Sequence, residues 1–415
     1  MQSLTVYADF DFLPGPQELG TLDYDRVRGN EVYAFAYHPG WLAKYGGIGL
    51  GKDLLTVPGR QFASEGLFGC FADALPDRWG RTLAEKREAI EAQQQRRSPK
   101  ALTSFDYLLS IDDFMRMGAL RFKESPIGPF LNDQADLRVP PIATIRELAD
   151  AADAVERSDE KGELPQEQWL YQLLNPGTSL GGARPKSNVM DTDGTLYVAK
   201  YPSRSDRHDV ALWEHFGHLL ARSCGISSAD TRVVECGKRY HTLLSRRFDR
   251  KADGKRIHFA SALTHLGFKD GTGAADGKGY LDIVDFILQA CPDTERNLEE
   301  LYRRVAFNIC IGNGDDHFRN HGFLLGPRGW TLAPAYDLNP SLSLTQALMI
   351  SETTNESSLT ALREAHEAYF LPATKADSIL AEVKTAIRGW PSLARRLHLA
   401  PSEVALFADR LNRFV

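Results

Sequence analysis

The stretch between two apolar runs near residue 315 concentrates side chains suited to phosphate chemistry. In IGNGDDHFRNHGFLL, which runs from Ile311 to Leu325, Asp315 and Asn320 lie five positions apart. A protein-kinase catalytic loop has this spacing, because its Asp accepts the proton of the substrate hydroxyl and its Asn holds a magnesium ion. The stretch therefore suggests phosphoryl transfer, with Asp315 as the catalytic base and Asn320 as a metal ligand.

A second metal-binding carboxylate is expected at Asp337. It follows two strand-like runs that are joined by a Gly-Pro-Arg-Gly turn, in FLLGPRGWTLAPAYDL. Magnesium prefers oxygen ligands and usually takes one or two protein groups together with phosphate and water, so Asn320 and Asp337 would be sufficient. We place His317 among the residues beside the nucleotide, chiefly as a support of the loop, whereas Asp316 and Arg319 receive no role.

Two upstream residues match the remaining kinase roles. The run TLYVAK places Lys200 at the end of a predicted strand, where it would reach the α- and β-phosphates of ATP, and Glu214 lies on the next predicted helix, where it would hold Lys200 in an ion pair. Each feature taken singly is weak, because a lysine at a strand end is usually a solvated edge residue. The complete set, in kinase order along the chain, favours a kinase.

The small-residue run GTSLGGARPKS fits no standard phosphate-loop pattern. A Walker A loop would need a second glycine directly before Lys186, and this position is Pro185. The run also lacks the GxGxxG pattern of protein kinases. Its glycines could still bring backbone N–H groups against phosphate, and the alternative is a flexible loop without a ligand.

The composition is that of a folded chain with no overall attraction to nucleic acid. With 415 residues, 43% of them apolar, the chain is long enough for two or three domains. Its formal net charge is −6, so a contact with nucleic acid would need a local patch or a partner. Five cysteines without a CxxC pair predict buried, reduced thiols. The N-terminus lacks a leader pattern and no stretch reaches about 18 uncharged apolar residues, so we expect a soluble, cytoplasmic protein without membrane contact.

Strand-like and helix-like patterns divide the chain into a β-rich and a helical part. LTVYADF and EVYAFAY predict short strands separated by turn residues such as LPGPQELG, and residues 67–91 are helix-like. Residues 125–141 are rich in proline and read as a connector. IATIRELADAADAVER and residues 209–224 predict amphipathic helices. Helices dominate from Tyr280 onward, apart from the segment around Asp337.

These patterns predict an α+β, protein-kinase-like, two-lobed fold with an additional small subdomain at its N-terminus. We expect four parts: the subdomain at 1–125, a connector and helix at 126–165, an ATP-binding region at 166–250, and a helical lobe at 251–415 that carries the catalytic and metal-binding loops.

Several motifs together resemble the HipA family, the serine/threonine-kinase toxins of bacterial toxin–antitoxin modules. The resemblance covers nearly the whole chain. Its most specific pieces are SLGGARPK (179–186), RRFDR (246–250), GNGDDHFRN (312–320) and APAYDLNPS (333–341). YHPGWLA, GLFGCFADALPDRWGR and MGALRF resemble the small β-rich N-terminal subdomain of the family.

The resemblance implies the site residues. It agrees with Asp315 as the base, Asn320 and Asp337 as magnesium ligands, and Lys200 at ATP. It further implies a phosphate loop that contains Ser179, Leu180, Gly181, Gly182, Ala183 and Lys186, and an adenine contact at the backbone of Leu244, Ser245 and Arg246. In such kinases a serine at the start of this loop is autophosphorylated, which switches the enzyme off. Ser179 matches that position, and the adjacent Thr178 is the alternative.

The resemblance also implies partners. A small helix-turn-helix antitoxin (HipB-like) would bind operator DNA and hold the toxin, so that DNA contact is mainly indirect. Protein substrates of family members include aminoacyl-tRNA synthetases. Two other functions stay open at this point: a small-molecule kinase on a related scaffold, since Asp315 would serve another hydroxyl equally well, and a non-catalytic ATP-binding co-repressor.

Overall fold

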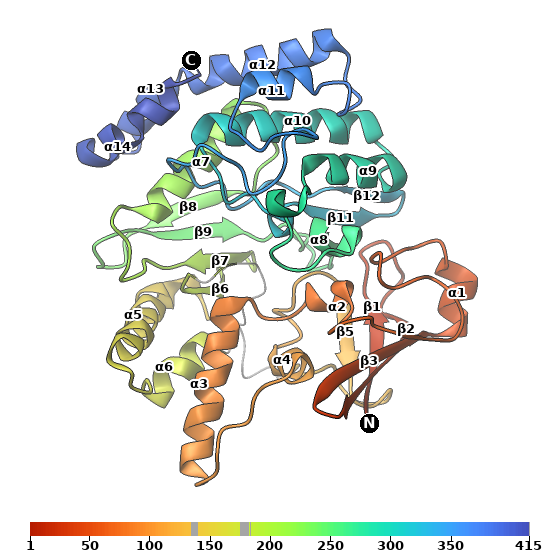
Figure 1. The fold of residues 1–415 in the computed structure, drawn as a ribbon. Helices are drawn as coiled ribbons and strands as arrows, with labels where there is room; N and C mark the ends of the chain where they lie inside the picture. Colours follow the sequence, from red (N-terminus) through yellow and green to blue (C-terminus); the bar gives the residue numbers. More distant parts are fainter. Residues whose placement is uncertain (134–139, 175–181, 183, 415) are drawn as a thin grey trace. The chain divides into compact units, whose positions relative to one another are not determined.

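The chain forms two compact units that are assembled from several segments each. The computed structural model describes residues 1–133, 140–174, 182 and 184–414 (Figure 1). The first unit comprises residues 1–206, 235–260 and 325–327, and the second comprises residues 207–234, 261–324 and 328–415. The predicted subdomain and most of the predicted ATP-binding region therefore belong to the first unit. The finer division into four parts stays a prediction.

The first unit begins with a five-stranded antiparallel sheet in the order β4-β3-β2-β1-β5. Its strands are β1 (Gln2–Ala8), β2 (Gln17–Val27), β3 (Asn30–Tyr37), β4 (Arg60–Phe62) and β5 (Leu120–Lys123). The strands predicted in LTVYADF and EVYAFAY are confirmed as β1 and β3.

Strand β2 is missing from the sequence-based prediction, because its glycine and the preceding prolines are typical of a turn. In the structure Gly20 is an interior strand residue opposite Tyr37. A Cβ atom at this position would lie 2.2 Å from the carbonyl oxygen of Ala36, so the close approach of two backbones requires glycine here.

A second antiparallel sheet of the first unit carries Lys200. Strand β6 (Lys186–Met190) pairs with β7 (Leu196–Lys200), which in turn pairs with β9 (Thr242–Arg246). Asp193 and Gly194, a pair typical of tight hairpin turns, lie between β6 and β7. Strand β10 (His258–Ser261) leads the chain into the second unit.

Several helices of the first unit begin at a residue whose side chain caps the helix. Asp77 caps α3 by accepting a hydrogen bond from the backbone N–H of Gly80, and Thr103 and Asp106 form a reciprocal capping box at α4. Helix α6 contacts both α3 and α5. The helices are α1 (Pro39–Tyr45), α2 (Gly69–Ala72), α3 (Arg78–Gln94), α4 (Ser104–Ser110), α5 (Ile145–Lys161), which follows the short η2 (Ile142–Thr144), and α6 (Glu167–Leu174).

The RRFDR motif forms a buried ion-pair cluster in the first unit. Arg247 binds the Asp249 carboxylate through two hydrogen bonds of 2.9 and 2.8 Å, and Arg250 lies 2.6 Å from it. The backbone N–H of Gly118 donates to the same carboxylate at 2.8 Å. Both arginines also donate to backbone carbonyls of residues 114–118. The cluster therefore joins the end of β9 to the segment that precedes β5, 131 residues earlier.

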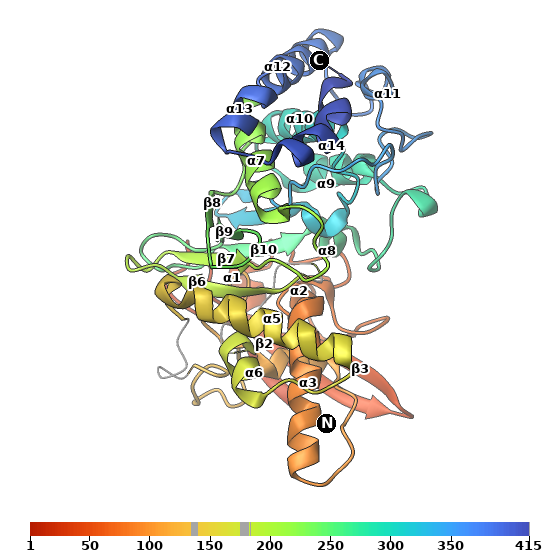
Figure 2. The same cartoon turned by 90° about the vertical axis from the view of Figure 1, so that its left-hand side faces the viewer.

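The second unit is mainly helical and is built around α10 (Thr294–Ile311). Helix α10 contacts α9 (Tyr280–Ala290), α12 (Ala373–Ile387) and α14 (Pro401–Asn412), and α9 and α12 lie on opposite sides of it in both views (Figures 1 and 2). The predicted helix at 209–224 is confirmed as α7 (Val210–Ser223), which Asp209 caps. The remaining elements are β8 (Thr231–Val234), α8 (Ala262–Leu266), η3 (Ala274–Asp276), η4 (Phe318–Asn320), β11 (Gly322–Gly326), β12 (Gly329–Leu332), α11 (Leu359–Glu364) and α13 (Trp390–Arg396).

Candidate active site

The loop that carries Asp315 lies between helix α10 and the hairpin of β11 and β12, as predicted. Helix α10 ends at Ile311, and Gly312 follows with φ of +72°, a left-handed conformation that favours glycine. A Cβ atom on Gly312 would lie 2.2 Å from the carbonyl oxygen of Ser341. The buried end of α10 therefore turns sharply and directs the following residues toward the surface.

Asp315 and Asn320 lie on one turn of this loop. The side-chain amide nitrogen of Asn320 donates to the carbonyl oxygen of Asp315 at 3.1 Å, and the backbone N–H of His317 donates to the same oxygen at 3.1 Å. The Asp315 side chain is exposed, whereas Asn320 is 9% exposed. The hydrogen-bonded backbone of this turn thus carries an Asp315 carboxylate that is exposed to solvent. The side-chain oxygen of Asn320 is the atom suited to a cation.

The segment that carries Asp337 is hydrogen-bonded to the Asp315 loop. Asn313 donates through its side chain to the carbonyl oxygen of Asp337 at 3.4 Å, and the Tyr336 hydroxyl donates to the carbonyl oxygen of Arg319 at 2.5 Å. Asp337 has φ of +54°, which is uncommon for a residue with a side chain and is typical of functional loops. The structure therefore brings the predicted base and both predicted metal ligands into adjacent segments of one unit.

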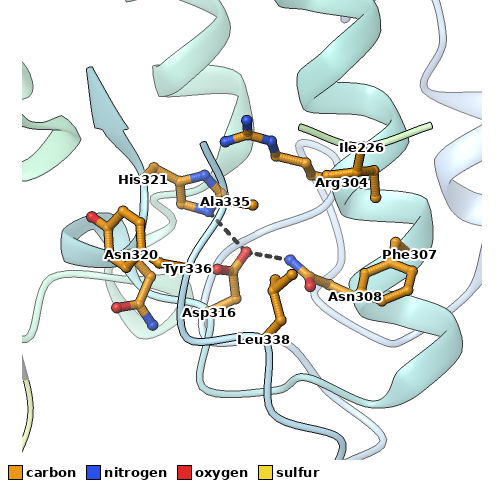
Figure 3. Close-up of a pocket in the computed structure, with 10 residues that line it drawn as sticks. All are labelled: Ile226, Arg304, Phe307, Asn308, Asp316, Asn320, His321, Ala335, Tyr336 and Leu338. Carbon is orange, nitrogen blue, oxygen red and sulfur yellow. Dashed lines mark hydrogen bonds and ion pairs between the residues drawn. The ribbon is translucent and has the colours of Figure 1, made fainter. Parts of the chain in front are cut away.

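Asp316 is the functional residue that the sequence patterns missed. It is 3% exposed, and one carboxylate oxygen accepts hydrogen bonds from the Asn308 amide at 2.7 Å and from His321 Nε2 at 2.8 Å (Figure 3). The same oxygen accepts a third hydrogen bond from the Tyr280 hydroxyl at 2.7 Å. Burial by itself would raise the pKa of Asp316, but the His321 ring and the hydrogen bonds outweigh this effect and lower it. Asp316 thus anchors the turn that carries Asp315.

A small pocket lies beside this anchor. Asp316, Asn320 and His321 form one side of it, and the segment before Asp337 forms another (Figure 3). The other lining residues are Ile226, Arg304, Phe307, Asn308, Ala335, Tyr336 and Leu338. Asn308 is a buried polar residue among the apolar residues at the end of α10, Val305–Ile311, and this is the sequence signal that could have indicated a buried partner such as Asp316.

Asp316→Asn is expected to lower the free energy of unfolding by about 3 kcal/mol, because it removes the negative charge that three buried donors, the His321 ring among them, surround. Asp315→Asn is the matched control, since the neighbouring side chain is exposed and its replacement should change stability by less than about 0.5 kcal/mol. Urea denaturation of both variants measures the difference. Equal losses would contradict the anchoring role of Asp316.

The predicted nucleotide-binding residues on the second sheet lie in the first unit. Lys200 is half-buried and pairs across the strands with Lys186 on one side and Leu243 on the other. Leu244, Ser245 and Arg246 form the end of β9, where Leu244 is buried and Arg246 is exposed. The predicted site thus draws on residues of both units, and the way in which they meet stays a prediction.

Lys186 occupies a buried ion pair. Its ammonium group lies 2.8 Å from the carboxylate of Asp77, with side-chain exposures of 2% and 1%. Gly182 has φ of +101°, and a Cβ atom on it would lie 3.1 Å from Lys186 Nζ. Gly182 therefore lies close to the ammonium group of Lys186. Thr178, Ser179, Leu180, Gly181 and Ala183 lie outside the described residues.

Glu214 is a buried residue of α7, with 3% exposure. One of its carboxylate oxygens lies 3.8 Å from Nε2 of His218, one turn later on the same helix. Its predicted partner Lys200 belongs to the other unit. The ion pair of Lys200 and Glu214 therefore stays a prediction.

The fold and the loop geometry define an α+β protein of the kinase-like type, in which an Asp–Asn loop connects a buried helix to a hairpin. The sequence matches the HipA N-terminal domain over residues 13–122 and the HipA-like C-terminal domain over residues 178–390. The chain belongs to the HipA family.

Known relatives are similar over less than half of the chain. The serine/threonine-protein kinase toxin HipA of Shewanella oneidensis is 27% identical over 213 residues, which are 45% of this chain and 48% of that protein. A putative kinase of Haemophilus influenzae is 26% identical over 197 residues, 42% of this chain and 57% of that protein. The aligned region thus spans about half the length of the curated relatives.

A solved structure shares the fold over nearly the whole chain. It is the complex of the Shewanella oneidensis toxin–antitoxin system HipA, HipB and its operator DNA, with a TM-score of 0.65 and 18% identity, and the match covers 99% of this chain and 95% of that chain. The predicted α+β fold is thereby confirmed.

Two further expectations can be compared with the structure. All five cysteines lie in the described part of the chain and are free and buried, as predicted. Among the helices of the described residues, none has the length and apolar character that crossing a membrane requires.

Proposed function

We propose that the chain is a Mg-ATP-dependent serine/threonine protein kinase that acts as the toxin of a toxin–antitoxin module. The observation that carries this proposal is the contrast between the two adjacent aspartates. Asp316 is buried and hydrogen-bonded, whereas Asp315 is exposed on the turn that Asp316 anchors. An exposed carboxylate on a fixed backbone is suited to orient a hydroxyl group and accept its proton.

The other residues would place ATP for this reaction. Asn320 and Asp337 have the oxygen donors that magnesium prefers, and when bound the ion would neutralise charge on the transferred phosphate. Lys200, supported by Glu214, would contact the α- and β-phosphates, the backbone of residues 244–246 would hold the adenine, and His317 would brace the loop. The protein then needs only positioned charge and no strong nucleophile of its own.

The proposed partners follow from the relatives. The structural relative is a complex of HipA with HipB and operator DNA. We infer a helix-turn-helix antitoxin as the partner of this chain, with operator DNA bound mainly through it, because a net charge of −6 does not favour direct binding to DNA. Growth would be inhibited by phosphorylation of a cellular protein, for which an aminoacyl-tRNA synthetase is the first candidate.

The proposed function is tested directly by asking whether the kinase phosphorylates itself and thereby loses activity. After incubation with Mg-ATP we expect phosphate on Ser179 or Thr178 and falling kinase activity, because a phosphate of charge near −2 would repel the phosphates of ATP. Mass spectrometry of the purified protein, with EDTA-treated protein as the control, measures the modification, and Ser179→Ala and Thr178→Ala distinguish the two hydroxyls. Absence of phosphate between Thr178 and Ser187 would remove this switch from the proposal.

A further inference from the structure

Residues 341–344, in the segment that follows Asp337, have exposed leucine side chains and serine side chains that are only partly exposed. Leu342 and Leu344 are 52% and 60% exposed, whereas Ser341 and Ser343 are only partly exposed. In an extended chain alternate side chains point to opposite sides. A surface segment normally places its apolar side chains inward, so this alternation is the reverse of the usual one.

Hydrogen bonds of Ser341 hold the segment against the start of the loop that carries Asp315. The Ser341 hydroxyl donates to the carbonyl oxygen of Gly312. The backbone N–H of Ser341 donates to the carbonyl oxygen of Ile311 at 3.2 Å. A Cβ atom on Gly314 would lie 2.5 Å from the Ser343 hydroxyl, so the segment touches the residue directly before Asp315. The two leucines therefore flank the contact point next to the proposed base.

Hydrogen bonds also fix the backbone on the C-terminal side of the two leucines. The carbonyl oxygen of Leu344 accepts a hydrogen bond from Ser357 N–H at 2.8 Å. Gln346 and Asn355 exchange two hydrogen bonds of 2.8 Å each, and the Gln346 side chain donates to the Ser357 hydroxyl at 2.9 Å. Residues 344–357 thus form a loop closed at its base. The leucines are exposed on a preorganised backbone, which lowers the entropy cost of binding.

We infer that Leu342 and Leu344 are the docking platform for the polypeptide substrate, and that they select an aliphatic or aromatic side chain close to the acceptor serine or threonine. The inference rests on the proposed kinase function. Burying a leucine side chain contributes about 1.5–3 kcal/mol, and the chain forgoes this contribution at both positions. Because Ser343 lies against Gly314, we expect a peptide whose hydroxyl reaches Asp315 to pass close to the two leucines, and an apolar neighbour of that hydroxyl would cover them.

The test compares phosphorylation of two peptide pools. Every peptide contains a single serine or threonine. In one pool Leu, Ile, Val or Phe lies near this residue, and in the other pool Gly, Asn or Gln takes the same positions. We expect the wild-type chain to show a kcat/KM roughly tenfold or more higher for the apolar pool. In Leu342→Ser/Leu344→Ser this preference should disappear, mainly through a raised KM. Leu406→Ser is the matched control, because Leu406 is 47% exposed on α14, and it should keep the preference.

The outcomes separate the inference from the function on which it rests. Asp315-dependent phosphate transfer that treats both pools alike, or a double variant that keeps the preference, would overturn the docking platform and leave the kinase intact. A double variant that loses self-association or antitoxin binding while its peptide kinetics stay unchanged would assign the leucines to another surface and overturn the inference too. Absence of Asp315-dependent transfer to any peptide or protein would contradict the proposed function itself.

Discussion

Asp315→Gln is expected to reduce phosphate transfer to protein by about 10³-fold or more in kcat, while ATP binding stays within a few-fold. The glutamine keeps a polar side chain but cannot accept the proton of the substrate hydroxyl, and general-base catalysis contributes roughly 10²–10⁴-fold. ATP is held by other residues, so the loss appears in the transition state. Transfer of labelled γ-phosphate measures the rate, and calorimetric titration measures the binding of ATP.

The control for this prediction is Asp409→Gln, which replaces an exposed aspartate of α14 in the same unit. It should retain full activity. Phosphoproteomics of cells that briefly express the wild type or Asp315→Gln would identify the protein substrate in the same experiment. The assignment of Asp315 as the base would be contradicted if the kcat of Asp315→Gln stays within tenfold of the wild type. It would also be contradicted if this variant remains fully toxic without the antitoxin.

Asp249→Ala is expected to lower the free energy of unfolding of the first unit by about 3–5 kcal/mol. The Asp249 side chain is fully buried, and its removal leaves Arg247 and Arg250 without the carboxylate that neutralises them. Chemical denaturation followed by circular dichroism measures the loss. Asp253→Ala is the matched control, because this aspartate lies four residues further on and is 56% exposed. Its replacement should cost less than about 0.5 kcal/mol, and a similar loss in both variants would contradict the role of the cluster.

The ion pairs of Asp249 also predict that the free energy of unfolding depends on pH. Burial alone would raise the pKa of Asp249, but the charges of Arg247 and Arg250 outweigh burial and hold the pKa below its ordinary value. A depressed folded-state pKa contributes stability above the unfolded-state pKa of about 3.9, and this contribution is lost as the pH falls below that value. The stability difference between the wild type and Asp249→Ala should therefore be constant near neutral pH and shrink below about pH 4. A difference that does not change there would contradict the ion-pair account.

Local sequence patterns were sufficient for most elements around the site. The helix before Asp315, the hairpin after it, and the strand that ends at Lys200 were predicted from periodicity and turn residues. These features depend on residues that are close in the sequence, and backbone preferences of neighbouring residues act on that scale. The five-residue spacing of Asp315 and Asn320 is likewise a local property, because one turn of chain sets their separation.

The roles of several residues could only be seen in the tertiary structure. Strand β2 was missed, because Gly20 signals a turn until its close contact with Ala36 is known. Lys186 was expected at a phosphate, and its buried pairing with Asp77 was not anticipated.

The two aspartates of the site show most clearly what the sequence alone does not reveal. Asp315 and Asp316 are identical side chains in adjacent positions, and their chemistry differs only because Tyr280, Asn308 and His321 converge on the second one. Burial and partners from distant parts of the chain decide the charge state and the freedom of a carboxylate. Residue type and spacing along the sequence carry no such information. They predicted Asp315 as the base from its distance to Asn320, whereas the folded structure showed that Asp316 is buried and holds the loop and that Asp315 is exposed.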